Sequence, residues 1–64
     1  MNEKLIKVYD LVINNDNLVI TLIKKDSYYI LEKCIINSNV INLIYQKKFK
    51  NYEKALCQFK KLMT

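Results

Sequence analysis

The sequence predicts an α+β fold, in which a four-stranded antiparallel β-meander is followed by one C-terminal amphipathic helix packed on one face of the sheet. Three observations support this prediction: four runs rich in Ile, Val, Leu and Tyr, short Asn- or Asp-containing separators between them, and a change to helical spacing after Phe49. No linker, repeat or low-complexity stretch interrupts the chain. Residues 1–64 are therefore expected to form a single ββββα domain.

The expected strands are the four apolar runs, which cover residues 5–13, 18–24, 28–36 and 40–47. The separators cover residues 14–17, 25–27 and 37–39, and each contains Asn or Asp. The chain contains no glycine and no proline. Since Asn and Asp are the remaining residues best able to adopt the positive φ of tight hairpin turns, we expect three hairpins and the strand order 1-2-3-4.

The expected helix begins after Asn51, which stands where an N-cap should. Its apolar residues recur at the spacing of one helical face: Tyr52, Ala55, Leu56, Phe59, Leu62 and Met63. Glu53 lies in the first turn, whereas Lys60 and Lys61 lie in the last turn, which are the favourable signs of charge for the helix dipole.

Alternation of side chains assigns the strand residues to two faces, if residues 13 and 18, 24 and 27, and 36 and 40 are paired. The face expected beneath the helix contains Leu5, Tyr9, Leu11, Ile13, Leu18, Ile20, Leu22, Tyr29, Leu31, Ile35, Ile41, Leu43 and Tyr45, with Lys7, Lys24, Lys33 and Lys47. The opposite face contains Ile6, Val8, Val12, Val19, Ile23, Tyr28, Ile30, Cys34, Ile36, Val40 and Ile44, mixed with Asp10, Thr21, Glu32, Asn42 and Gln46.

The face opposite the helix is the more informative one for function. Its apolar residues would exceed the few hundred Å² that a monomer usually exposes, and its polar residues argue against a dry core. Such a mixed surface is typical of a protein interface, for which the candidate residues are Val8, Val19, Thr21, Tyr28, Ile30, Glu32, Asn42 and Ile44. The alternative is an ordinary two-layer protein whose Ile-rich outer face reflects a bias toward A/T-rich codons.

The residue inventory argues against an enzyme. The chain contains no histidine for general acid–base catalysis and no glycine for a phosphate-binding loop. Its two cysteines, Cys34 and Cys57, have no histidine to activate them and are too few for a structural zinc site. Asp10 and Glu32 are interpreted as solvated surface acids. We therefore expect no catalytic residues, no cofactor and no metal.

The net charge of +5 is carried by the C-terminal third of the chain, because residues 1–40 contain five lysines and five acids. The candidate nucleic-acid-binding residues are Lys47, Lys48, Lys50, Lys54 and Lys61, with Tyr28, Tyr45 and Phe49 as nearby aromatics. The absence of arginine removes the side chain best suited to bidentate recognition of phosphate or guanine. Any binding to nucleic acid is thus expected to lack sequence specificity. A solvated helix face, with lysine enriched by codon bias, is the alternative.

The chain shows no secretory signal and no apolar stretch long enough to span a bilayer, so the cytoplasm is the expected compartment and no membrane association is expected. Two functional hypotheses follow. The first is a non-catalytic protein-interaction module that binds another protein or itself, as a homodimer, through its outer face or a sheet edge. Its size and composition are typical of phage or mobile-element proteins that inhibit host machinery such as defence systems. The second hypothesis is a nucleic-acid-binding protein that uses the lysine cluster.

Overall fold

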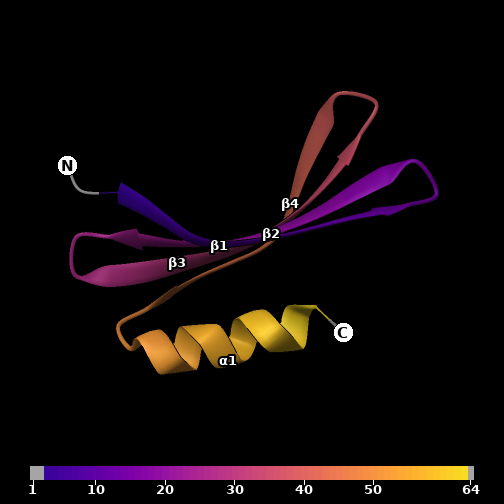
Figure 1. The fold of residues 1–64 in the computed structure, drawn as a ribbon. Helices are drawn as coiled ribbons and strands as arrows, with labels where there is room; N and C mark the ends of the chain where they lie inside the picture. Colours follow the sequence, from indigo (N-terminus) through magenta and orange to yellow (C-terminus); the bar gives the residue numbers. More distant parts are fainter. Residues whose placement is uncertain (1–2, 64) are drawn as a thin grey trace.

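In the computed structural model, which describes residues 3–63, four antiparallel strands are followed by one helix (Figure 1). The strands are β1 (Glu3–Ile13), β2 (Asp16–Lys25), β3 (Tyr28–Asn37) and β4 (Val40–Phe49), and the helix is α1 (Tyr52–Leu62). They form one sheet in the order β1-β2-β3-β4, which confirms the predicted meander. The helix contacts β2, β3 and β4 and lies against one face of the sheet.

All three hairpins are closed by two-residue turns, because Ile13 pairs with Asp16, Lys25 with Tyr28, and Asn37 with Val40. Both residues of the first turn, Asn14 and Asn15, have positive φ, and so do both residues of the third, Ser38 and Asn39. In the second turn Asp26 has positive φ. Asn and Asp thus take most of the positions that glycine usually fills in hairpin turns, as the sequence predicts. The pairings themselves differ from the expected ones by one or two residues.

The helix begins as predicted, with Asn51 as its N-cap and the Asn51 side-chain oxygen accepting a hydrogen bond from the backbone N–H of Lys54 at 3.0 Å. Ala55 and Phe59 are its buried residues, and they pack with Ile20, Leu22 and Leu31 of the two central strands. Partly buried side chains surround this small core: Ile6, Tyr9, Tyr29, Tyr45, Phe49 and Leu62. We call the face of the sheet that carries Ile20, Leu22 and Leu31 the inner face, and the opposite one the outer face.

The helix covers only part of the inner face. Eleven residues of α-helix extend about 16 Å, whereas a strand of ten residues extends about 33 Å. We call the end with the turn at residues 26–27 the proximal end, and the end with the turns at residues 14–15 and 38–39 the distal end. Tyr52 of the helix contacts Tyr29 at the proximal end, with ring centroids 5.5 Å apart. The distal half of the inner face extends beyond the helix.

Two β-bulges correct the predicted assignment of residues to faces. The register shifts between Leu5 and Lys7 in β1, so Leu5 pairs with Ile23 on the outer face and Ile6 packs against the core. A second shift follows Lys33: Lys33 pairs with Tyr45, whereas Cys34 pairs with Leu43. The β4 residues before this bulge are displaced by one position, and a displacement by one residue exchanges the two faces.

Four residues of β4 therefore lie on the face of the sheet opposite to the expected one. Ile41 pairs with Ile36 and Leu43 with Cys34, which puts them on the outer face instead of the inner one. Asn42 pairs with Ile35 and Val40 with Asn37, which puts these two on the inner face instead of the outer one.

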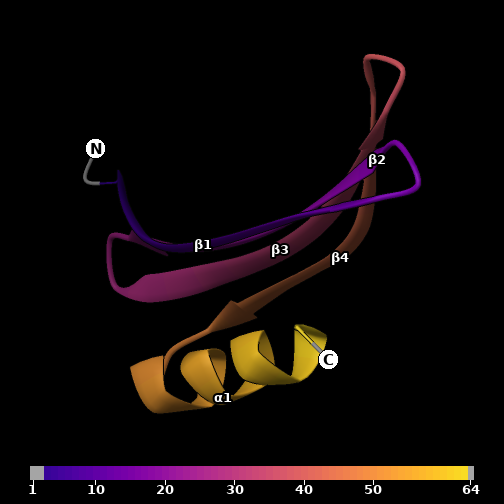
Figure 2. The same cartoon turned by 45° about the vertical axis from the view of Figure 1, so that its right-hand side comes forward.

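Figure 2 shows that the distal end of the sheet and the start of β1 curve away from the helix, so the outer face is concave. The hairpin ends at the distal end also diverge from each other, as expected from the twist of a sheet with strands of ten or eleven residues (Figure 1). The concave surface is formed by the strand residues of all four strands that point away from α1.

Candidate protein interface

The outer face contains six of the eight candidate interface residues. Val8, Thr21 and Glu32 form one cross-strand row, since Val8 pairs with Thr21 and Thr21 with Glu32. The others lie in neighbouring rows: Val19 pairs with Cys34, Ile30 with Ile23, and Tyr28 with Lys25. Directly paired residues point to the same face, so these side chains line one continuous surface.

The other two candidates, Asn42 and Ile44, are not on this surface. Asn42 faces the same side as Ile35, and Ile44 lines a distal hollow of about 300 Å³ together with Leu18, Lys33 and Ile35 of the inner face. The bulge in β4 is the physical reason, because it adds one residue to the strand between Leu43 and Tyr45. The prediction that Asn42 and Ile44 belong to the outer face is therefore wrong.

Sequence reasoning missed three apolar members of the outer face, namely Leu5, Ile41 and Leu43. Each is more than half exposed. A signal for two of them is present in the sequence, because Leu5-Ile6 and Leu43-Ile44 are apolar doublets that break strict alternation at the two bulges. A doublet of this kind does not by itself distinguish a bulge from a strand that is apolar on both faces.

Polar side chains interrupt the apolar residues of the outer face, and one pair of them is hydrogen-bonded. Gln46 donates a hydrogen bond from its side-chain amide to the Glu32 carboxylate on the neighbouring strand. Cys34 lies next to this pair, and burial, with a smaller contribution from the Glu32 carboxylate, raises the pKa of its thiol. The thiolate is thus disfavoured in this apolar surface. The other cysteine, Cys57, is exposed on α1, and both thiols are free.

The lysine cluster does not form one surface. Lys47 pairs with Leu31 on the inner face, with its ammonium 5.3 Å from the Phe49 ring centroid. Lys48 pairs with Ile30 on the outer face. Lys50 lies at the bend between β4 and α1, and Lys54 and Lys61 lie on the helix. The strand alternation separates Lys47 from Lys48, so at most part of the predicted cluster can contact one ligand.

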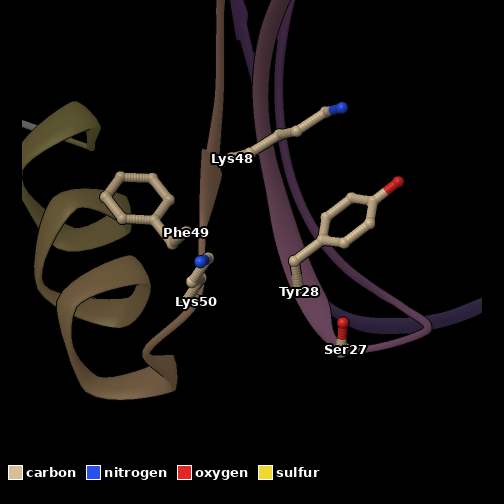
Figure 3. Close-up of a pocket in the computed structure, with 5 residues that line it drawn as sticks. All are labelled: Ser27, Tyr28, Lys48, Phe49 and Lys50. Carbon is tan, nitrogen blue, oxygen red and sulfur yellow. The ribbon is translucent and has the colours of Figure 1, made fainter.

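One part of the cluster is brought together at the proximal end. The Lys48 ammonium lies 5.0 Å from the Tyr28 ring centroid, and both residues line a hollow of about 490 Å³ with Ser27, Phe49 and Lys50. Figure 3 shows that Lys48 and Tyr28 extend away from the helix, whereas the Phe49 ring points toward it. This hollow therefore opens beside the outer face, and it combines two ammonium groups with an aromatic ring.

Within residues 3–63, no three His, Cys, Asp or Glu side chains lie close enough together to hold a metal ion. In the same part of the chain, no helix has the length and apolar character needed to cross a membrane. The chain matches no protein-family model, and no curated protein or solved structure is significantly similar to it.

Proposed function

We propose that this protein is a non-catalytic, cytoplasmic protein-interaction module that binds a larger protein through its outer face. The observation that carries the proposal is the concave, apolar outer face, which lies opposite the helix and is not covered by any part of residues 3–63 (Figure 2). Val8, Leu5, Ile41 and Leu43 are exposed there in rows interrupted by polar residues. Protein interfaces combine an apolar centre with a polar rim in this way.

Ile30 lies on an inner strand of this surface, near its proximal end, and has paired neighbours on both sides, Ile23 on β2 and Lys48 on β4. A lysine at this position would bury an ammonium group beneath any protein that covers the face, at a large cost in desolvation. Ile30→Lys should therefore abolish binding while leaving the inner core intact. Asn42→Lys is the matched control, because it adds the same charge to an exposed position on the inner face.

The experiment captures proteins from the source cells with the wild type, Ile30→Lys and Asn42→Lys, and identifies those retained. Support requires one protein that binds the wild type and Asn42→Lys stoichiometrically, and that Ile30→Lys loses while its circular dichroism is unchanged. If folded Ile30→Lys retains the same protein, the outer face is not the interface.

The role of the bound complex is proposed from size and composition. A chain of 64 residues with eleven lysines and no arginine is typical of phage or mobile-element proteins that block host machinery, such as a defence system, by stoichiometric binding. Expression of the wild type in cells with an active defence system should then raise the plating efficiency of a restricted phage. Ile30→Lys should lose this effect and Asn42→Lys should keep it. Equal plating with all three proteins and an empty vector would contradict the inhibitory role.

A second candidate function, binding of single-stranded nucleic acid without sequence specificity, is favoured by the proximal hollow. There Tyr28 could stack on a base while Lys48 and Lys50 contact phosphates. The test is fluorescence anisotropy with a labelled oligonucleotide. Affinity should fall steeply as salt rises, because counterions are released on binding, and Lys48→Ala should lower both the affinity and the salt slope. A salt-independent interaction, or none, would exclude this function.

A further inference from the structure

The exposed apolar side chains are concentrated on the two edge strands. Of the eleven large apolar side chains that are exposed in the described part of the chain, nine belong to β1 or β4. On β1 they include Val8, Leu11, Val12 and Ile13, which follow one another closely along residues 8–13. An edge strand also presents unpaired backbone N–H and C=O groups, which is a template for pairing with another strand.

The two edges differ in how well they are protected against such pairing. In β4 a bulge lies next to Ile44, and Lys47 and Lys48 follow it. In β1 the bulge lies between Leu5 and Lys7, so the register from Lys7 to Ile13 is regular. Residues 8–13 contain no lysine, and Asp10 is their single charged residue. Bulges and edge lysines are the usual protections, and this segment has neither.

The hairpin geometry identifies which backbone groups of β1 face the open edge. The carbonyl of the residue before a two-residue turn accepts a hydrogen bond from the N–H of the residue after it, which makes Ile13 and Asp16 a hydrogen-bonded pair. Hydrogen-bonded and non-hydrogen-bonded pairs then alternate along an antiparallel ladder. Leu11 and Tyr9 consequently bond toward β2, whereas the N–H and C=O groups of Val8, Asp10 and Val12 point to the open edge.

We infer that residues 9–13 of β1 pair antiparallel with the same segment of a second copy, across a two-fold axis at Leu11. In this register Leu11 faces Leu11 of the second copy, and Tyr9 faces Ile13. Each Asp10 faces Val12, so the two carboxylates do not oppose each other. A two-fold axis at Asp10 would place them opposite each other, which is destabilising. The register centred on Leu11 thus pairs apolar side chains without opposing like charges.

The charge distribution permits this contact despite the net charge of +5. All eleven lysines lie outside residues 8–13, and the nearest on the same strand is Lys7. In the register centred on Leu11 the two Lys7 residues stand about 26 Å apart along the paired strands, which exceeds the Debye length of about 8 Å at physiological salt. Repulsion between the copies is therefore largely screened.

The small core gives the second copy a stabilising role. Only Ile20, Leu22, Leu31, Ala55 and Phe59 are buried among residues 3–63, and chains of this size commonly need an additional source of stability. Pairing at β1 would extend the sheet into a second copy and cover Leu11, Val12 and Ile13. An isologous contact of this kind closes after two copies, so it produces a dimer and not a filament.

Light scattering and a pair of proline variants test the contact. The wild type should have twice the monomer mass of 7.7 kDa at micromolar concentration and dissociate on dilution. Val12→Pro removes an N–H from the open edge of β1, where proline is tolerated, and should halve the mass. Ile41→Pro is the matched control on β4, because Ile41 is also one residue from its hairpin's closing pair and is exposed to a similar degree, 69% against 66% for Val12. It should remain dimeric.

A cysteine scan tests the register without the need for proline. In a background with Cys34→Ser and Cys57→Ser, Leu11→Cys should form an intermolecular disulfide on mild oxidation, because a non-hydrogen-bonded pair places Cα atoms about 4.5 Å apart. Ile13→Cys, which faces Tyr9 of the second copy, should not. A monomeric wild type up to millimolar concentration, a monomer with Ile41→Pro but not Val12→Pro, or stronger crosslinking of Ile13→Cys than of Leu11→Cys would each overturn the inference.

The inference does not depend on the proposed function. Ile30 lies on the outer face of β3, away from the β1 edge, so Ile30→Lys should remain dimeric while it loses the larger partner. Val12→Pro, at the distal rim of the outer face and away from Ile30, should become monomeric but keep the larger partner. A failure of the edge contact is thereby distinguished from a failure of the outer face.

Discussion

Ile30 and Leu31 are adjacent in β3 but lie on opposite faces of the sheet. Leu31 is fully buried beneath the helix, whereas Ile30 is partly exposed on the concave outer face, paired with Ile23. The two residues have similar size and apolarity, so their different surroundings come from alternation alone. The same substitution at the two positions should therefore have different effects.

The first prediction is that Leu31→Lys unfolds the protein and Ile30→Lys does not. An ammonium in place of the Leu31 side chain would be buried against Phe59 and Leu22 without a partner. At Ile30 the ammonium reaches solvent. Circular dichroism with thermal melting measures both variants. If both unfold, the outer face is covered in the native state, and if neither does, the helix is not packed on Leu31.

Phe59→Ala should be among the most destabilising changes in the chain. Phe59 is 4% exposed and packs with Ile20, Leu22 and Leu31, so its removal leaves a cavity in the centre of a small core. Truncation of a buried Phe costs about 3–5 kcal/mol. Urea unfolding should show this loss of free energy, with Met63→Ala, at the exposed C-cap of the helix, as the control. Equal stability of the two variants would contradict the packing of the helix.

Replacement of Asn15 by glycine and by alanine should change the stability of the protein in opposite directions. Its φ of 70° lies in the left-handed region, where a side chain with a Cβ is disfavoured and Asn is tolerated better than most. Asn15→Gly completes an Asn-Gly pair, the preferred sequence for this turn, and should raise the melting temperature. Asn15→Ala should lower the free energy of unfolding by about 1 kcal/mol. If both substitutions changed the stability in the same direction, the turn at Asn14 and Asn15 would not be of type I′.

The two thiols should differ in reactivity. Burial and the Glu32 carboxylate raise the pKa of Cys34, so at a given pH a smaller fraction is thiolate, and the thiolate is the reactive form. Cys57 is exposed on the helix. Iodoacetamide at neutral pH should therefore modify Cys57 first, and the rate at Cys34 should continue to rise above pH 9. Mass spectrometry of the peptides measures both rates. Faster labelling of Cys34 would contradict the partly buried position of its thiol beside Glu32.

The fold was predictable because the local signals agree with one another. Asn14, Asn15 and Asn39 mark two of the turns, and Asn51 marks the start of the helix. The stripe with Ala55 and Phe59 indicates which side of the helix is buried. These features act over a few residues, so they can be recognised without knowledge of the tertiary structure.

The face on which each candidate interface residue lies was predictable only up to the bulges. Alternation places Val8, Val19 and Ile30 correctly because their strand segments are regular. It fails at Asn42 and Ile44, because one extra residue in β4 exchanges the faces from that point to the hairpin. The position of a bulge depends on how the neighbouring strand and the core pack together, and a single strand's sequence does not specify this.

Because the helix is shorter than the strands, the part of the sheet that it covers should be more stable against local opening than the part beyond it. The side chains of Ile20, Leu22 and Leu31 pack against Phe59, so exchange of their amide protons requires the central strands to separate and this packing to be lost. The hairpin ends beyond the helix can open without disturbing that contact, and such fraying costs much less free energy than global unfolding. Native-state hydrogen exchange should consequently show a gradient along each strand, slow near the turn at residues 26–27 and fast toward the turns at residues 14–15 and 38–39.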